Sequence, residues 1–307
     1  KMRFIFVKEL IKYASKNKNV YLITSDLGYR AFESFKKKYP KRFINVGVAE
    51  NNMVGVGAGL ALTGKKVFVY SILPFLVFRS LEQIRNNICH NNLDVTLIGA
   101  GGGFSYGPQG ISHNTSEDIA IIRSLPNIKV FNPGSRIEVE QVLKIIFKQK
   151  SPSFLRLGKC PEKEFHKKKT KLINGKGLLV CKGKDLTIFC TGNILENIFE
   201  AVKKIELEGY SVKLLSMPIM KPINPNFIKS NLSSKKVLTI EENSKIGGLS
   251  SIISAIIPKI DNKKFHFKSL ALEDIVHNKI GSQNYLRDIN KLSVNKIYKF
   301  LKTYINE

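Results

Sequence analysis

The alternation of strand-like and helix-like stretches is the feature that most constrains how this chain can fold. Short apolar runs bounded by turn residues, typical of buried strands, alternate with longer stretches that have helical spacing of apolar residues. Val20–Ser25, Lys66–Tyr70 and Val95–Gly99 are predicted strands, and Arg79–Asn91 and Arg136–Lys148 are predicted helices. Such an order favours helices packed on both faces of a mostly parallel sheet, so we predict an α/β fold.

The length of the chain and one basic segment predict two domains. A chain of 307 residues can form two domains of ordinary size, each with a sizeable core. Residues 161–177 are basic and contain glycine, as linkers often do. We expect two consecutive three-layer α/β domains, 1–160 and 178–307, joined by this linker.

The formal charge of +26 raises the question of nucleic-acid binding. Only nine of the 50 basic residues are Arg, and the runs Lys36–Lys38 and Lys167–Lys169 lack interleaved aromatic residues that could stack on bases. We therefore expect a solvated basic surface and no nucleic-acid partner, although a basic non-enzymatic scaffold stays open as an alternative. The electrostatic field of such a basic surface would attract anionic substrates.

Apolar runs and cysteines indicate the cellular setting. No apolar run reaches the roughly 18 residues that a membrane-spanning helix needs, and Lys1–Leu10 lacks the pattern of a signal peptide. Cys89, Cys160, Cys181 and Cys190 lie far apart and form no CxxC pair. We expect a soluble protein of the reducing cytoplasm, with no membrane partner, no disulfide framework and no metal ligands of its own.

Residues 42–61 carry the strongest chemical signal. A predicted strand runs into Glu50 at the start of a helix rich in Gly and Ala. A carboxylate there could simply stabilise the helix N-terminus through the helix dipole. The nearby Gly59–Lys66 stretch resembles a phosphate-binding loop, but Lys66 stands where that loop needs Ser or Thr, and no GxGxxG occurs.

The string RFINVGVAENNMVGVGAGLA of residues 42–61 closely resembles the signature of transketolases. It is similar, more loosely, to deoxyxylulose-phosphate synthases and to the beta subunits of pyruvate-type dehydrogenases. In that superfamily the matching glutamate hydrogen-bonds N1′ of the aminopyrimidine of thiamine diphosphate, a cofactor that serves as an electron sink. The resemblance implies that Glu50 is a catalytic, cofactor-binding residue that shares a proton with N1′.

Other parts of the first domain resemble the same family. Thr24-Ser-Asp26-Leu-Gly28 looks like the family's T-A-D-L-G, whose Asp faces the cofactor, although an Asp after a strand can also be a helix cap. The stretch before Arg79-Ser-Leu-Glu-Gln-Ile-Arg resembles the one whose aromatic residue stacks on the pyrimidine. Phe75 is the expected stacking residue, and Phe78 takes that place if the alignment slips; core packing is the alternative for both.

Two further segments concern the substrate. Residues 107–120 are similar to the family's G-x-D-G-x-T-H-x-x-x-E-D-I-A, which implies that His113 is catalytic and moves protons beside the donor sugar. Ser153-Phe-Leu-Arg156 resembles the strand whose Arg binds the substrate phosphate, with a salt bridge as the alternative. Gln109 replaces the family's Asp, and Arg30 stands where Ser is usual. We take both as candidate substrate-binding residues and expect a specialised sugar preference.

The resemblance also implies that a separate subunit holds the diphosphate and the metal ion. The second domain resembles the transketolase C-terminal domain at Thr187–Gly192, Met217–Ile223 and Thr239–Glu242. The family holds diphosphate and Mg²⁺ with a G-D-G motif followed by an Asn, and no G-D-G occurs in this chain. We therefore expect the C-terminal subunit of a split transketolase, inactive alone, that transfers a two-carbon ketol unit between phosphorylated sugars. A separate N-terminal subunit would hold the metal in a two-plus-two assembly. A beta subunit of a 2-oxo acid dehydrogenase is the alternative.

Overall fold

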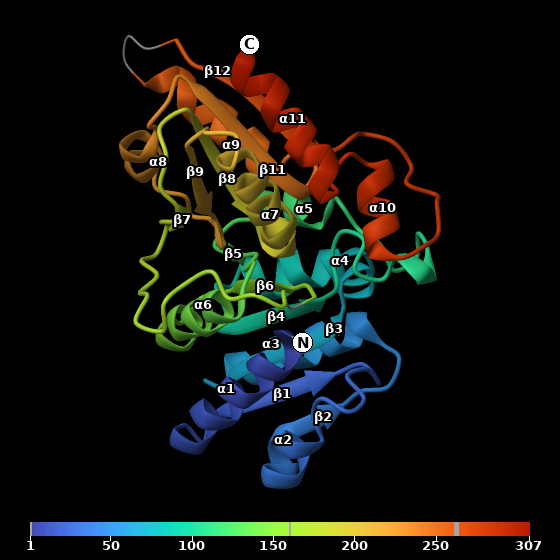
Figure 1. The fold of residues 1–307 in the computed structure, drawn as a ribbon. Coiled ribbons are helices and arrows are strands. Elements are labelled where there is room, and N and C mark those ends of the chain that lie inside the picture. The colour runs from blue at the N-terminus through green and yellow to red at the C-terminus, as the bar shows by residue number, and fades with distance from the viewer. Residues whose placement is uncertain (1, 160, 261–263) are drawn as a thin grey trace.

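Two α/β units follow one another along the chain in the computed structural model, which describes residues 2–159, 161–260 and 264–307 (Figure 1). The first sheet has the strand order β10-β5-β6-β4-β3-β1-β2, and its neighbouring strands are parallel except for the antiparallel pair β10 and β5. Its strands are β1 (Val20–Thr24), β2 (Phe43–Asn45), β3 (Lys66–Ile72), β4 (Val95–Ala100), β5 (Lys129–Phe131), β6 (Ser153–Leu157) and β10 (Ile219–Lys221).

Helices cover both faces of this sheet because its strands are apolar on both sides. α1 and α6 bury Phe6 and Leu143 against one face, whereas α3 and α4 bury Met53 and Leu76 against the other. The helices of this unit are α1 (Met2–Lys16), α2 (Glu33–Lys38), α3 (Glu50–Leu62), α4 (Leu73–Gln83), α5 (Asp118–Ser124) and α6 (Arg136–Lys148).

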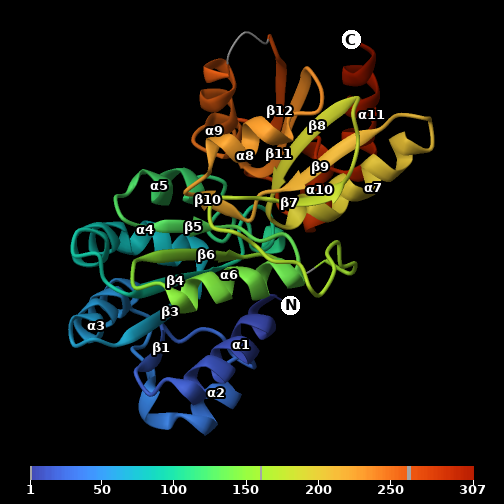
Figure 2. The ribbon, with the colours of Figure 1, turned by 90° about the vertical axis from the view of Figure 1, so that its left-hand side faces the viewer.

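The second sheet has the order β12-β11-β8-β9-β7, with only β7 antiparallel to its neighbour among the described residues. α7 and α11 lie together on one face, and α8 and α9 lie on the other side (Figure 2). The elements are β7 (Leu178–Cys181), β8 (Leu186–Thr191), β9 (Val212–Ser216), β11 (Lys236–Ser244), β12 (His266–Leu272), α7 (Leu195–Glu206), α8 (Pro225–Asn231), α9 (Leu249–Ile256), α10 (Gln283–Ile289) and α11 (Val294–Asn306).

The predicted fold class is confirmed, and single elements differ from expectation. The helix predicted over Arg79–Asn91 begins earlier, at Leu73, because Pro74 suits the first turn of a helix. It then widens into a π-helical turn over Ile84–Cys89. β10 comes from the C-terminal part of the chain yet pairs with β5 of the first sheet, which ties the two units together. The limits of the linker remain a prediction.

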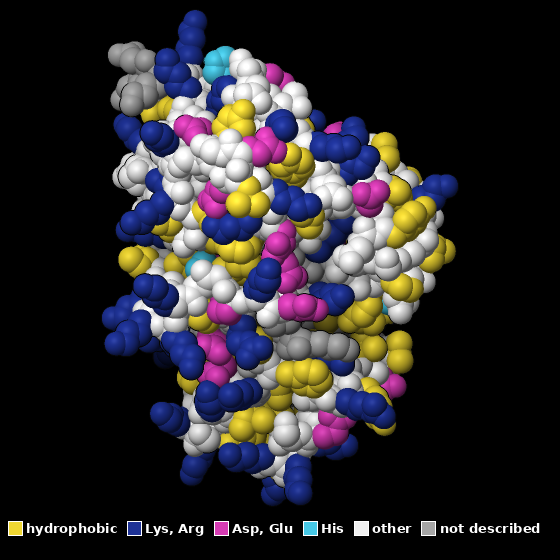
Figure 3. Space-filling view, in the orientation of Figure 1, with side chains coloured by type: hydrophobic (Ala, Val, Ile, Leu, Met, Phe, Trp, Pro, Cys, Tyr) yellow, Lys and Arg dark blue, Asp and Glu magenta, His cyan; other side chains and the backbone are white. Residues whose placement is uncertain are grey.

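The surface is basic over both units. Lys and Arg side chains spread over the face seen in Figure 3, with Asp and Glu among them and apolar side chains between. Among the described residues no helix combines the length and the apolar character needed to cross a membrane.

Candidate functional site

Glu50 is a buried carboxylate at the edge where the parallel strands end. It is the first residue of α3, and only 3% of it is exposed. Its Oε1 accepts hydrogen bonds from the hydroxyls of Ser25 and Ser71, at 3.3 and 3.4 Å, and its Oε2 accepts one from Arg79 Nη1 at 3.0 Å. Ser25 directly follows β1 and Ser71 lies near the end of β3, so the strand order itself brings these donors together.

Aromatic side chains extend this cluster from Glu50 to His113. The Arg79 guanidinium carbon lies 4.1 Å from the centre of the Phe75 ring, and that ring meets the His113 ring edge-on at 5.0 Å. The structure thus joins three of the predicted site residues in one continuous row. Phe78 is 46% exposed and borders an open surface hollow beside Arg79. Which of the two phenylalanines would stack on a cofactor ring stays a prediction.

Two other predicted residues lie in the loop after β1. Asp26 is exposed, has a positive φ of 55°, and accepts a hydrogen bond from Asn45 Nδ2 at 3.0 Å. Arg30 is also exposed, and its guanidinium lies 5.6 Å from the centre of the Tyr29 ring. Both therefore present polar groups to the outside, where a partner or substrate could reach them.

The glycine-rich loop after β4 carries Gln109 and His113. Gln109 is exposed in a short 3-10 turn, and His113 is half-buried with its Nδ1 3.0 Å from the Ser112 hydroxyl. Gly101 has a φ of 96°, and a β-carbon there would lie 2.6 Å from the Tyr106 ring, so the loop needs glycine at this position.

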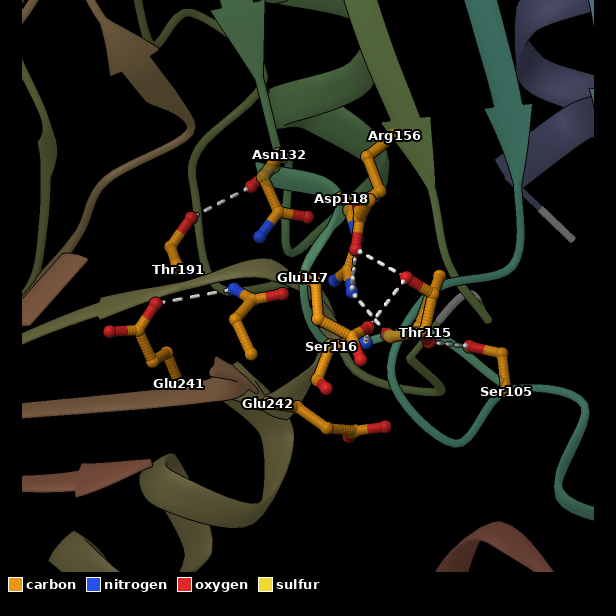
Figure 4. Close-up of polar contacts among 12 residues, drawn as sticks. Ser105, Thr115, Ser116, Glu117, Asp118, Asn132, Arg156, Thr191, Glu241 and Glu242 are labelled. Carbon is orange, nitrogen blue, oxygen red and sulfur yellow. Dashed lines mark hydrogen bonds and ion pairs between the residues drawn. The ribbon is translucent and has the colours of Figure 1, made fainter. Parts of the chain in front are cut away.

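Arg156 already has a partner inside the protein. It is 3% exposed, and its Nε donates to Oδ2 of the fully buried Asp118 at 2.9 Å (Figure 4). Its Nη2 also donates to Asp118 Oδ1 and to the backbone carbonyl of Thr115, both at 3.3 Å. Burial raises the pKa of the Asp118 carboxyl, and the Arg156 charge opposes that rise. The predicted contact between Arg156 and a substrate phosphate remains a prediction.

The structure also contains a pocket of about 410 Å³ that was not predicted from the sequence. It opens where β4 and β6 end, and Arg3 and Lys159 supply two cations to its wall. Nε of Arg3 is buried and has no hydrogen-bond partner among the described residues. Lys159 could have been noticed, because ligands of open α/β sheets bind beyond the carboxyl ends of the strands. Arg3 gives no such signal, since it belongs to a helix at the other end of the domain's sequence.

The residues around Glu50 fit one end of thiamine diphosphate. A buried carboxylate beside half-buried aromatic rings suits an aminopyrimidine that must accept a proton from, or share one with, an acid. The described residues hold no cluster of three or more His, Cys, Asp or Glu side chains that could bind a metal ion. Mg²⁺ prefers oxygen ligands, so the donors in the described part of the chain do not fit the metal-diphosphate end of the cofactor.

Comparison with known proteins also indicates the transketolase family. Residues 1–160 match the family described as the transketolase pyrimidine binding domain, and residues 175–297 match the transketolase C-terminal domain. A putative transketolase C-terminal section from Methanocaldococcus jannaschii is 34% identical over 259 residues, covering 83% of this chain and 81% of the relative. One subunit of an apulose-4-phosphate transketolase from Phocaeicola vulgatus is 30% identical over 251 residues, covering 81% and 80%.

A solved structure extends the likeness to the whole chain. A split gene transketolase, described as an inactive beta4 tetramer, superposes with a TM-score of 0.88 at 28% identity and covers 99% of this chain and 98% of its own. The fold and the matched segments define an α/β protein built on a pyrimidine-binding domain. Within that class the chain belongs to the transketolase family, of which it contains the pyrimidine-binding and C-terminal domains. The predicted resemblance is confirmed.

Proposed function

We propose that this chain is the C-terminal subunit of a split, thiamine-diphosphate-dependent transketolase. In this proposal it transfers a two-carbon ketol unit between phosphorylated sugars once a separate subunit has joined it. The observation that carries the proposal is the row from the buried Glu50 through Arg79 and Phe75 to His113. This row puts a carboxylate, an aromatic ring and an imidazole at the edge of the sheet where the parallel strands end.

Each residue of the row has a distinct task. When bound, thiamine diphosphate supplies a carbon nucleophile and an electron sink for breaking a bond between two sugar carbons. Glu50 holds a proton at N1′ of the pyrimidine ring, and Ser25, Ser71 and Arg79 fix its orientation. Phe75 packs against the ring, and the His113 imidazole moves protons at the hydroxyls of the sugar. Asp26 is a further cofactor-binding candidate at the open side of the site.

We assign the anionic end of the sugar to the pocket of Arg3 and Lys159. The pocket is large enough for a phosphate with part of a sugar, and it offers two cations. Among the described residues Nε of Arg3 is buried and has no hydrogen-bond partner, whereas the Arg156 guanidinium is held by Asp118. The name of the Phocaeicola vulgatus relative specifies a sugar phosphate, which supports a phosphorylated substrate for this chain.

A separate subunit would complete the cofactor site. It would carry the G-D-G motif with its Asn and hold Mg²⁺ and the diphosphate, in a two-plus-two assembly located in the cytoplasm. The described residues offer no carboxylate cluster for the metal, and the similar split gene transketolase is described as an inactive tetramer of beta chains. Both observations support a chain that is inactive alone.

Reconstitution tests this proposal. The chain is mixed with a G-D-G-containing subunit from the same genome, thiamine diphosphate and Mg²⁺, and ketol transfer is measured across ketose donors and aldose acceptors. We expect transfer only from the mixture. Transfer by the chain alone, or decarboxylation of 2-oxo acids in place of transfer, would overturn the proposal.

The same measurement tests substrate specialisation at Gln109 and Arg30. An amide donates as well as accepts hydrogen bonds, and Arg30 adds a cation near the expected acceptor path, so we expect a preference other than xylulose 5-phosphate with ribose 5-phosphate. Gln109→Asp should shift the ranking of donors. The specialisation is refuted if that pair is best by a wide margin and Gln109→Asp leaves the ranking unaltered.

A further inference from the structure

Both units of the chain build the wall of the cationic pocket. Arg3, Ser105, Tyr106 and Lys159 come from the first unit, but Ser282 and Gln283 come from the start of α10 in the second. Ser282 is exposed and caps α10 through a hydrogen bond from Tyr285 N to its Oγ, whereas Gln283 is half-buried. Gln283 is therefore the side chain by which the C-terminal domain reaches the place assigned above to the substrate's anionic end.

A buried carboxylate fixes the position of Gln283. Glu242 at β11 is 2% exposed, and its Oε1 accepts hydrogen bonds from the backbone nitrogen of Phe104 at 2.6 Å and from Gln283 Nε2 at 3.1 Å. Its Oε2 accepts a bond from Nε of the buried Arg287 at 2.5 Å. One carboxylate thus joins the glycine-rich loop of the first domain to two side chains of α10.

Two glycines allow close packing at this junction. A β-carbon at Gly103 would overlap Glu242 Oε1, and one at Gly107 would overlap the carbonyl oxygen of Gly281. The nitrogen of Gly281 also donates to the Gly107 carbonyl at 3.4 Å. Since only glycine permits so close an approach, Gly103 and Gly107 let the loop pack directly against Glu242 and against Gly281 before α10.

We infer that Gln283 is a specificity-determining residue that hydrogen-bonds the anionic end of the sugar substrate. The inference rests on the proposed function, because it gives the C-terminal domain a direct part in substrate recognition. A carboxamide nitrogen carries two hydrogens, and the Glu242 carboxylate uses one of them. Nε2 also lies 3.5 Å from Glu242 Oε2, so one hydrogen directed between the two carboxylate oxygens serves both. The inference gives the other hydrogen to an anion between Arg3 and Lys159. A neutral donor at this point adds a directed bond without a third charge.

A charge substitution with a matched neighbour tests the inference. In the reconstituted complex, Gln283→Glu places a negative charge in the pocket wall, and Asn284→Glu places the same charge one residue further, on an exposed side chain outside the pocket. The KM values for ribose 5-phosphate and for ribose are compared, together with the inhibition constant of inorganic phosphate. Gln283→Met removes the donor without adding charge, in case the new carboxylate beside Glu242 disturbs folding.

We expect Gln283→Glu to raise the KM for ribose 5-phosphate at least about tenfold relative to that for ribose, because like charges in a partly buried site repel strongly. Phosphate inhibition should weaken in parallel, Gln283→Met should have a smaller effect of the same sign, and Asn284→Glu should have none. Equal changes for both sugars, or no change in either Gln283 variant, would overturn the inference. If the parent complex itself does not distinguish the two sugars, the assignment of the pocket in the proposed function fails instead.

Discussion

Arg79 donates a hydrogen bond to Glu50 at 3.0 Å, so a guanidinium that is half exposed covers a carboxylate that is 3% exposed. A buried carboxylate without a partner is costly, and here the partner comes from the solvent side, where the cofactor ring is expected. The same guanidinium lies over Phe75. Arg79 therefore holds both the predicted acid and the predicted stacking ring, although the sequence singled out neither contact.

Replacement of Arg79 tests this double role. Arg79→Met should lower kcat of the reconstituted complex by roughly tenfold or more, the size expected for the loss of one hydrogen bond to a charged group. Arg79→Lys should recover part of the loss, because it keeps the charge but not the planar geometry. Steady-state kinetics at saturating cofactor provide the measurement, and a fully active Arg79→Met complex would contradict the role.

Arg156→Met should destabilise the protein in a pH-dependent way. Without Arg156, the buried Asp118 carboxyl has a pKa raised further above its unfolded value, so its protonated form favours the folded state. Below the unfolded pKa both states are protonated, and stability is lost as the pH rises through the folded pKa. The loss should reach about 3–5 kcal/mol at pH 7 and shrink toward pH 4. Urea unfolding across pH measures it, and a pH-independent loss would contradict the prediction.

Arg3 and Arg156 should respond differently when the phosphate of the substrate is varied. Arg3→Met removes a cation from the pocket and should raise the KM for ribose 5-phosphate about tenfold, with a smaller effect for ribose. Arg156→Lys should lower stability and leave the ratio of the two KM values near that of the parent, because the Arg156 guanidinium of the parent faces Asp118. The opposite pattern, with the larger change of the KM ratio in Arg156→Lys, would support the predicted contact between Arg156 and the phosphate.

The Glu242 carboxylate should matter strongly for stability. Glu242→Ala leaves the buried Arg287 and the Phe104 nitrogen without their partner, which should cost about 3–5 kcal/mol. Glu273→Ala is the control, because its ion pair with Lys245 is 3.9 Å long and mostly exposed, and it should change stability by less than about 0.5 kcal/mol. Urea unfolding measures the free energy of unfolding of both variants. Equal losses of stability in Glu242→Ala and Glu273→Ala would show that the Glu242 network is not a structural junction.

Local patterns predicted the fold and part of the site. The alternation of elements predicted parallel sheets covered by helices, and the pattern around Glu50 predicted a strand followed by a helix that begins at this residue. His113 and Phe75 were named from a family resemblance, and the structure brings their rings together. Their roles in catalysis remain predictions.

Other features depended on contacts between distant parts of the chain. Arg3 and Lys159 meet at one pocket from opposite ends of the first domain's sequence, and Gln283 joins them from the second domain. A single sequence carries periodicity and local motifs but no record of which distant residues touch. For the same reason the sequence did not show that Asp118 pairs with Arg156. The two residues meet because β6, which carries Arg156, lies beside β4, and Asp118 begins the helix α5 that follows β4 in the chain.

The most direct test of the account is hydrogen–deuterium exchange at C2 of thiamine diphosphate bound in the reconstituted complex, measured for the parent and for Glu50→Gln. Gln can hydrogen-bond N1′ but cannot share a proton with it. We predict that Glu50→Gln assembles and binds the cofactor, while C2 exchange slows by about 10²–10⁴-fold, the usual range for loss of a positioned acid. Exchange at the parent rate in a correctly assembled Glu50→Gln complex would contradict the central role given to this carboxylate.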